Sequence, residues 1–255
     1  MSNVQNPITL VTGGSRGLGK NTALHLARQG SDIILTYRSA RIDADAVVAE
    51  IEGLGRRAVA LQLDVAKSAS FGPFAAQVRQ QLATVWQREH FDALVNNAGA
   101  GAHASLMETT EAQFDDMVDI HLKGVFFLTQ RLLPLLADGG RIVNISSGLT
   151  RFALPGYGAY AAMKGAIEVL SKYMAKELGA RGIAVNVVAP GAIETDFGGG
   201  AVRDNAQLNQ FVASQTALGR VGLPDDIGGV IASLLAPANR WINAQRIEAS
   251  GGMFL

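Results

Sequence analysis

Three residues of this chain have types and spacing suited to moving a proton. Tyr160 and Lys164 stand four residues apart in Tyr-Ala-Ala-Met-Lys, and Ser147 lies 13 positions before the tyrosine (160 − 147 = 13). Residues four apart share one face of a helix, so we expect the ammonium beside the phenol. A phenol has a pKa of about 10, and a nearby cation lowers that pKa towards the range useful for general acid–base catalysis. Because Tyr-x-x-x-Lys also arises by chance on solvated helices, the pattern needs support from elsewhere.

A glycine-rich turn near the start of the chain provides that support. An apolar, β-branched run over residues 8–12 predicts a strand, and a helical pattern over residues 20–29 follows the turn. Between them stand Gly13, Gly17 and Gly19, whose missing side chains let the backbone approach a pyrophosphate at the N-terminus of the helix. The motif alone leaves a second interpretation open, namely a tight turn that needs glycine only for its backbone conformation.

Together, the two ends of the chain resemble the classical short-chain dehydrogenase/reductase family. The motifs that carry the resemblance run in order from Thr9 to Gly252. They are Thr12-Gly13-x-x-x-Gly17-x-Gly19, Asp64-Val65, Asn96-Asn97-Ala98-Gly99, Ser147, Tyr160-x-x-x-Lys164, and Pro190-Gly191 with Thr195. One position departs from the family, which usually has a functional Asn in the helix before Gly124, where this chain has His121.

The resemblance implies hydride transfer between the nicotinamide C4 and a carbonyl or carbinol carbon. Tyr160 would act as the general acid or base, Ser147 would hydrogen-bond the same substrate oxygen, and Lys164 would bind the nicotinamide ribose and lower the tyrosine pKa. His121 could replace the family's Asn in a proton relay, and its ordinary pKa of about 6.5 would then make turnover sensitive to mild acid. The alternative is that His121 only fills space.

The same resemblance implies a cofactor site at the carboxyl ends of the strands. The residues assigned to it are Gly13, Ser15, Arg16, Gly17, Leu18, Gly19, Tyr37, Arg38, Ser39, Asp64, Val65, Asn97, Ala98, Gly99, Tyr160, Lys164, Pro190, Gly191, Ile193 and Thr195.

Charge decides which nicotinamide cofactor fits. An acid about 20 residues after the glycine turn usually receives the ribose hydroxyls of NAD, whereas arginine accommodates the extra phosphate of NADP. The second strand ends Thr36-Tyr37-Arg38-Ser39, without an acid, and Arg16 lies inside the glycine turn. Two guanidinium groups could hold a 2′-phosphate, so we expect NADP(H) as the preferred cofactor, with NAD(H) as the alternative if Arg38 is only a solvated residue.

Composition excludes several other classes of protein. Acidic and basic residues cancel, 22 against 22, so no basic field attracts nucleic acid or an anionic membrane. Cysteine is absent, which is compatible with a reducing cytoplasm. The four histidines (25, 90, 103 and 121) lack ligand spacing, so no metal site is expected. The first seven residues do not resemble a signal peptide, and no apolar run has the length of a membrane span.

Short apolar runs alternate with helical patterns along the whole chain. Strands are predicted at Ile8–Thr12, Asp32–Tyr37, Ala58–Leu63, Ala93–Asn96, Arg141–Ser146, Ala184–Ala189 and Arg246–Ala249. Several are apolar throughout, which favours a parallel sheet covered on both faces. We therefore expect one Rossmann-like, doubly wound α/β domain over residues 1–255, of about seven parallel strands. The polar segment Ser68–Glu89 is expected to add surface length, and residues 196–221 a substrate lid.

The substrate pocket is predicted to be largely apolar. Its walls should come from residues 148–157, from His103 and its neighbours, and from residues 196–215, with Gly198–Gly200 as a flexible stretch. The apolar candidates are Leu149, Phe152, Leu154, Phe197 and Phe211, any of which could instead be ordinary core.

Three alternatives to a carbonyl reductase of small substrates stay open. A 3-oxoacyl-carrier-protein reductase would need a basic docking surface, for which Arg151, Arg203 and Arg220 are candidates. A cofactor sensor without catalysis and a scaffolding oligomer are the others. Helices around 125–136 and 160–173 are apolar on more than one face, which favours burial on both sides, and in this family the second contact is between subunits. We therefore expect a homotetramer.

Overall fold

The computed structural model describes residues 6–255. Residues 1–5, which belong to the segment that does not resemble a signal peptide, lie outside the described residues. Seven parallel strands form one sheet in the order β3-β2-β1-β4-β5-β6-β7, which confirms the predicted doubly wound α/β fold. The strands are β1 (Ile8–Val11), β2 (Asp32–Tyr37), β3 (Ala58–Gln62), β4 (Phe91–Asn96), β5 (Leu136–Ile145), β6 (Ala184–Pro190) and β7 (Arg246–Ala249).

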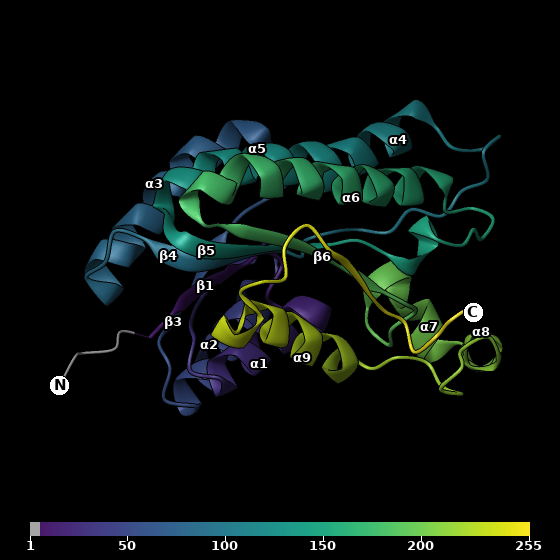
Figure 1. The fold of residues 1–255 in the computed structure, drawn as a ribbon. Helices are drawn as coiled ribbons and strands as arrows, with labels where there is room; N and C mark the ends of the chain where they lie inside the picture. Colours follow the sequence, from purple (N-terminus) through teal and green to yellow (C-terminus); the bar gives the residue numbers. More distant parts are fainter. Residues whose placement is uncertain (1–5) are drawn as a thin grey trace.

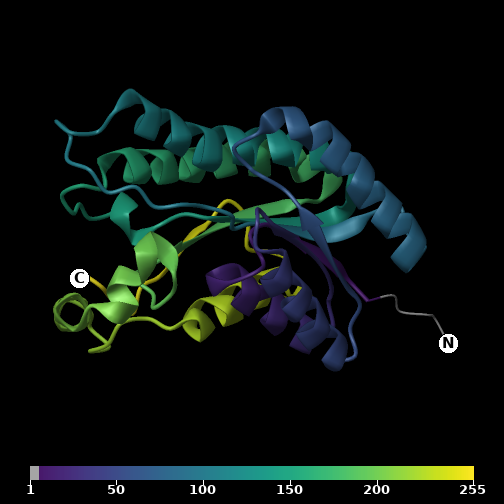
Figure 2. The same cartoon turned by 180° about the vertical axis from the view of Figure 1, so that it is seen from behind.

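Two layers of helices cover the sheet. The helices are α1 (Gly17–Arg28), α2 (Arg41–Gly53), α3 (Phe71–Gln81), α4 (Glu111–Val118), α5 (Gly124–Leu132), α6 (Gly158–Leu178), α7 (Ala201–Asp204), α8 (Ala206–Ser214) and α9 (Pro224–Leu235). Helices α3 to α6 lie on one face, and α1, α2 and α9 on the other (Figures 1 and 2). Successive side chains of β2 point to opposite faces, so Ile33 and Leu35 belong to one core and Ile34 to the other.

The order of the strands reverses between β1 and β4. The chain builds β1, β2 and β3 outward in one direction and β4 to β7 outward in the other, with Thr9 of β1 opposite Ala93 of β4. In such sheets the crevice beyond the carboxyl ends of the strands at the reversal is where ligands bind. A ligand site is therefore expected beyond the carboxyl ends of β1, β4, β5 and β6.

The prediction that the polar segment Ser68–Glu89 only adds length at the surface is wrong. It forms α3 and a π turn at Leu82–Trp86, and its apolar side chains face the core. The buried residues are Phe71, Phe74, Val78, Leu82 and Trp86. Their spacing of three and four residues is that of one helix face, and Pro73 is tolerated because it lies in the first turn of α3.

Two further segments matter for the site. The expected break after β6 is present, and α7 and α8 lie at the same end of the molecule as the last residues of the chain (Figure 1). The helix predicted to reach residue 136 ends at Leu132, because a 3-10 turn containing Pro134 follows and Leu136 begins β5. Among residues 6–255, no helix combines the length and apolarity required to cross a membrane.

Candidate active site

One cavity of about 670 Å³ lies beyond the carboxyl ends of the central strands. Every residue that the sequence assigned to catalysis or to the cofactor lines it, including His121, Ser147, Tyr160 and Lys164. Residues that the sequence did not single out also line it, among them Thr36, Ile120 and Met253. The fold thus brings to one place side chains that are far apart in the sequence.

The glycine turn at one end of the cavity is locked to the neighbouring loop. The Thr12 hydroxyl accepts hydrogen bonds from the backbone N–H groups of Asn97 (2.9 Å) and Ala98 (3.0 Å), and the Asn97 amide donates to the Thr12 carbonyl (2.9 Å). Gly13 has a φ of 66°, and a Cβ on Gly19 would collide with the Gly13 carbonyl oxygen. Glycine is therefore required here sterically, because the backbone of the turn packs directly against the first turn of α1.

Two arginines stand at the entrance to this end of the cavity. Arg16 precedes α1 directly, and Arg38 follows β2 directly; both line the cavity and both side chains are exposed. No carboxylate accompanies Arg38 at the tip of β2, where the sequence continues with Ser39. The electrostatics at this point therefore suit an anion better than a neutral ribose.

The three residues proposed to move a proton line the same cavity. Tyr160 and Lys164 are buried on the same face of α6, and the Lys164 Nζ lies 5.5 Å from the centre of the tyrosine ring. Lys164 Nζ also donates to the Ile145 carbonyl oxygen (2.8 Å) at the end of β5. Ser147 follows β5 in extended conformation, and its Oγ accepts from Leu149 N–H (3.2 Å).

The neighbouring Ser146 has a different set of contacts. Its buried hydroxyl donates to Glu168 Oε1 (2.7 Å) and is thereby used within the protein. Of the two serines, Ser147 is the one whose hydrogen bonding acts on the pKa of the Tyr160 phenol, which it lowers. These contacts favour Ser147 for the role that its 13-residue offset suggested, and that role stays a prediction.

Burial controls the protonation of the pair on α6. It lowers the pKa of the Lys164 ammonium to about 7. It raises the pKa of the Tyr160 phenol above its usual value of 10, and the bond with Ser147 acts against this rise. This direction differs from our expectation that Lys164 lowers the tyrosine pKa, because burial is the largest cause of the shift and favours the neutral phenol. At neutral pH the phenol is protonated and suited to donating a proton.

His121 lies in a π turn, Asp119–Lys123, between α4 and α5. It is almost fully buried, its Nε2 donates to the Ala100 carbonyl (2.7 Å), and its ring meets the Tyr160 ring edge-on at 5.2 Å. The remaining nitrogen, Nδ1, is buried without a hydrogen-bond partner among residues 6–255. Gly99 makes room for the ring, since a Cβ there would lie 2.8 Å from the imidazole Cε1.

The charge state of His121 differs from our expectation. Burial, followed by the nearby Lys164 charge, lowers the pKa of the imidazole to about 3, although the bond to Ala100 acts in the opposite direction. The ring is therefore neutral at mildly acidic pH, and its titration would not limit turnover there. With the proton on Nε2, the buried Nδ1 is an acceptor.

The far end of the cavity is lined by apolar side chains, as predicted. Leu149, Phe152, Leu154 and Phe197 all contribute, and the Phe197 ring lies 5.7 Å from the Tyr160 ring. Two candidates are corrected. Phe211 is half exposed and does not line the cavity; Leu208 and Val212 of the same helix line it. His103 does not line the cavity either, and its ring packs against Tyr157. One turn of α8 can present only one face to the cavity.

The three arginines considered for a docking surface are all paired with carboxylates. Arg151 contacts Glu248, Arg203 contacts Asp196 and Asp204, and Arg220 contacts Asp226. Each guanidinium charge is thus offset by a neighbour on the same chain. These residues do not form the unpaired basic surface that recognition of an acidic carrier would favour.

Comparison with known proteins gives the family. The family model described as enoyl-(acyl carrier protein) reductase matches residues 13–254. The 3-oxoacyl-[acyl-carrier-protein] reductase of Staphylococcus epidermidis is 37% identical over 252 residues, which cover 98% of this chain and 100% of the relative.

Two solved structures share the whole fold. The promiscuous reductase LugOII, which catalyses keto-reduction at C1 in lugdunomycin biosynthesis, has a TM-score of 0.93 and 38% identity, with 100% of both chains covered. The landomycin C-6 ketoreductase LanV, solved with NADP and rabelomycin, has a TM-score of 0.89 and 34% identity, with 99% of this chain and 98% of LanV covered. The chain therefore belongs to the classical short-chain dehydrogenase/reductase family of oxidoreductases, as a member similar to the 3-oxoacyl-carrier-protein reductases.

Proposed function

We propose that the protein is an NADP(H)-dependent reductase of neutral, largely apolar carbonyl compounds. The observation that carries the proposal is the position of Tyr160 and Ser147. They lie in one cavity that is lined by the glycine turn at one end and by apolar side chains at the other. A substrate oxygen held by these two hydroxyls would receive its proton from the phenol, and Ser147 would stabilise the charge that develops on it.

The residues present fit a nicotinamide dinucleotide. Gly19 lets the turn pack closely on Gly13 and Asn97, and a Cβ at Gly17, the first residue of α1, would meet no atom closer than 3.7 Å. Backbone amides at this helix N-terminus suit a pyrophosphate. Arg16 and Arg38 would hold the 2′-phosphate, and Lys164 the ribose hydroxyls. When bound, the cofactor supplies the hydride. The NADP in the LanV structure supports this choice of cofactor.

The apolar end of the cavity suggests the substrate class. Leu149, Phe152, Leu154 and Phe197 offer hydrophobic contacts and aromatic faces, which suit a flat, apolar ketone or quinone. The keto-reduction by LugOII and the rabelomycin bound to the ketoreductase LanV support a ketone as the substrate. Residues 196–221, with their three successive glycines at 198–200, would be the lid over this end.

The proposal is tested by measuring NADPH oxidation with a panel of neutral aromatic ketones and quinones, beside short aliphatic ketones of equal solubility. We expect the aromatic compounds to give the highest kcat/KM. NADPH binding without oxidation across the panel would contradict the proposal and favour a cofactor sensor.

A 3-oxoacyl-carrier-protein reductase is the second candidate, favoured by the Staphylococcus epidermidis relative. The carboxylates paired with Arg151, Arg203 and Arg220 weigh against it. The same 3-oxoacyl group offered on the carrier protein and on a small thioester separates the two candidates. A kcat/KM much higher on the carrier would identify a docking enzyme.

The structure leads to a prediction for His121. Its neutral Nδ1 would accept a hydrogen bond from a buried water that connects Lys164 to solvent, so His121→Leu should lower kcat about tenfold or more. The smaller polar variant His121→Asn, whose amide can also accept a hydrogen bond, should keep most of the activity. Steady-state kinetics of the three proteins over a range of pH measure the effect.

The acidic limb of the pH profile provides the control. Because the lowered pKa of about 3 keeps His121 neutral at mildly acidic pH, His121→Asn should leave that limb where it is in the wild type. A limb that moves in this variant would contradict the neutral assignment. If His121→Leu keeps the full rate, the side chain only fills space.

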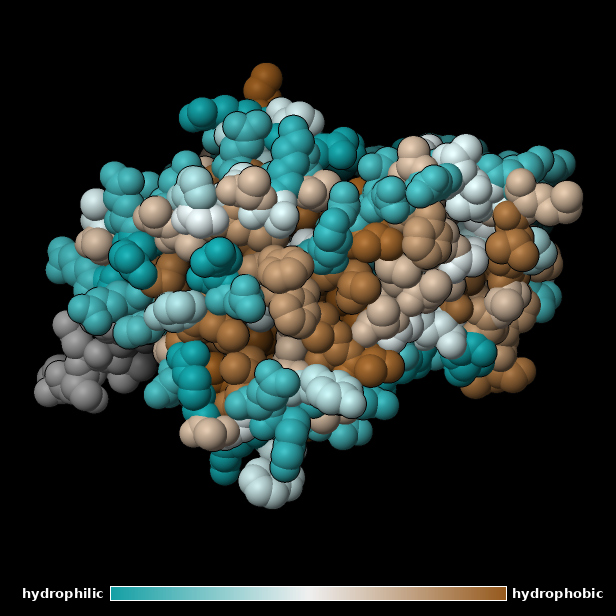
Figure 3. Space-filling view, turned by 90° about the horizontal axis from the view of Figure 1, so that it is seen from above, coloured by the Kyte–Doolittle hydropathy of each residue, from teal (hydrophilic) through white to brown (hydrophobic). Residues whose placement is uncertain are grey.

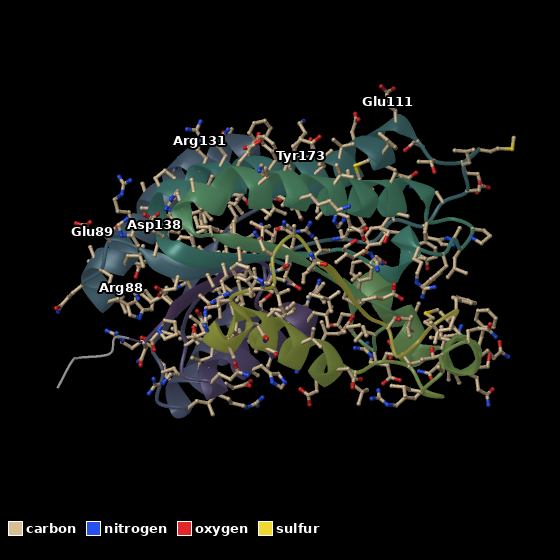
Figure 4. All side chains as sticks on the ribbon, in the orientation of Figure 1. Arg88, Glu89, Glu111, Arg131, Asp138 and Tyr173 are labelled. Atoms are coloured by element: carbon tan, nitrogen blue, oxygen red, sulfur yellow. The ribbon has the colours of Figure 1, made fainter. Side chains whose placement is uncertain are left out.

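We further predict a homotetramer. Large apolar side chains are exposed on the outer face of α4, α5 and α6, where apolar residues gather among polar ones (Figure 3). They are Phe114, Phe126, Phe127, Val169 and Tyr173, the last of which points away from the sheet (Figure 4). Exposed patches of this kind mark interfaces.

Light scattering should give four times the 26.8 kDa mass of the chain. The double variant Phe126→Lys, Tyr173→Lys should dissociate into smaller species, because two charges would be buried without partners. Ile42→Lys, on α2 in the other helical layer, is the matched control and should leave the mass unchanged. A monomer at micromolar concentration in the wild type would refute the prediction.

A further inference from the structure

The last residues of the chain, 251–255, lie between the α8 end of the lid and the turn that follows Ser147. We call them the terminal segment. On the lid side they form a short antiparallel pairing with residues 215–218, in which Thr216 is opposite Met253. Its backbone hydrogen bonds run from Ala217 N to Gly252 O (3.2 Å), from Leu218 N to Gly251 O (3.1 Å) and from Phe254 N to Gln215 O (2.9 Å).

On its other side the terminal segment is held by Arg151, four residues after Ser147. The guanidinium donates to the carbonyl oxygens of Phe254 (2.9 Å) and Met253 (2.5 Å). It also forms an ion pair with Glu248 of β7, at 2.6 Å between Nη2 and Oε1. One side chain therefore ties the end of the chain to the catalytic turn.

Further ion pairs and a hydrogen bond connect Glu248 to the turn after Ser147, which follows β5. Glu248 also pairs with Arg246 (2.9 Å), and Arg246 Nε donates to Glu168 Oε1 (2.7 Å). The same Glu168 oxygen accepts from Thr150 Oγ1 (2.7 Å), within the turn after Ser147. The two arginines hold the pKa of the Glu248 carboxyl at about 2, Arg151 being the largest cause and Ser250 adding a hydrogen bond. The Glu248 carboxylate is thus charged at neutral pH and pairs with both arginines.

The terminal segment is also part of the cavity. Met253 is 2% exposed, lines the cavity and packs with Val212 of α8 and with Phe152. The other end of the lid begins with Gly198, Gly199 and Gly200, whose φ angles are 62°, 74° and 78°. A run of glycines gives little resistance to rotation of the backbone, and side-chain contacts such as Arg203 with Asp196 hold this end. The α8 end of the lid is held by the backbone pairing with the terminal segment.

We propose that the terminal segment is a positioning strut, which Arg151 uses to hold the lid in register with the Ser147 turn. Met253 is the side chain through which the strut contacts substrate. Arg151 itself acts through Met253 and the lid, and it touches neither substrate nor cofactor. The proposal rests on the proposed carbonyl reduction for its kinetic readout only.

The test compares Arg151→Gln with a matched variant at the opposite end of the sheet. Arg181 makes the same kind of contacts, with Asp138 (2.7 Å) and with the carbonyl oxygens of Leu133 and Leu136, and its side chain is 35% exposed against 37% for Arg151. Asp138 lies far from the end of the chain (Figures 1 and 4). Arg181→Gln therefore removes equivalent bonds without touching the strut.

For Arg151→Gln we expect KM for the carbonyl substrate to rise roughly tenfold, with kcat and the dissociation constant of NADPH within about threefold of the wild type. Amide hydrogen exchange should accelerate in residues 205–218 and stay unchanged in β1 and β4. Arg181→Gln should change neither KM nor exchange in 205–218. Arg151→Lys keeps the positive charge but lacks the forked donors of a guanidinium group. Its KM should therefore lie between those of the wild type and Arg151→Gln.

Unchanged exchange in 205–218 of Arg151→Gln would overturn the strut, whatever the substrate is. Exchange that rises equally throughout the chain, or equally in Arg181→Gln, would also overturn it, since the effect would then be one of general stability. Because exchange needs no turnover, it separates failure of the strut from failure of the proposed reaction.

Discussion

Tyr160→Phe should lower kcat by a factor of about 10²–10⁴ and leave the dissociation constant of NADPH nearly unchanged. The variant keeps the ring that packs against His121 and Phe197 and removes only the hydroxyl. The lost contribution is therefore proton transfer to the substrate oxygen and not the shape of the site. Stopped-flow oxidation of NADPH measures turnover, and fluorescence titration of NADPH measures binding.

Tyr157→Phe is the matched control for this experiment. Tyr157 lines the same cavity three residues earlier, and its ring packs against His103. It should keep most of the wild-type kcat, because the proposed chemistry does not use its hydroxyl. Lys164→Ala should weaken both turnover and NADPH binding, since two roles are assigned to that ammonium. More than a tenth of the wild-type rate in Tyr160→Phe would refute the acid–base role.

Arg38→Asp should reverse or erase a preference for NADPH over NADH, with a change of about 10²-fold in the ratio of the two kcat/KM values. The substitution removes a donor for the 2′-phosphate and adds a carboxylate that repels it. The same carboxylate is the group that receives the ribose hydroxyls of NAD. Steady-state kinetics with both cofactors, at one ionic strength, measure the ratio.

Arg41→Asp makes the same change of charge three residues further on, at the start of α2, where the side chain is exposed and outside the cavity. It should change the ratio by no more than about twofold, because charges exposed to water are largely screened. Equal effects in the two variants would mean that Arg38 acts through the general field of the protein. Equal use of both cofactors by the wild type would show that Arg16 and Arg38 are solvated charges.

The sequence predicted those parts of the fold and of the site that depend on residues close to one another in the chain. The strand and glycine turn at residues 8–19 follow from β-branched residues and from positions where a Cβ would collide. The spacing of Tyr160 and Lys164 follows from the period of a helix. Such features depend on neighbours in the sequence, and the cavity lining agrees with them.

What the sequence did not predict depends on contacts between distant segments. Met253 lines the cavity only because the end of the chain pairs with residues 215–218, and no local pattern signals that pairing. The pKa of Lys164 follows from the extent of burial, which spacing does not give. Arg151 is a charged residue in the sequence, and only the fold brings Glu248 to it. The buried apolar residues of α3 recur at helical spacing in the sequence, but the polar residues around them led us to expect a surface segment.

The π turn at Asp119–Lys123 determines in which direction the side chains of α5 point. The Gly124 N–H donates to the Asp119 carbonyl, five residues earlier, so the turn contains one residue more than an α-helical turn. One residue corresponds to about 100° of rotation about the helix axis. The rotation therefore sets the direction of Phe126 and Phe127, which are partly exposed, relative to the helix before the turn, while His121 within the turn contacts the Tyr160 ring. A single deletion in this turn would therefore disturb the chemistry and the outer face of the molecule together.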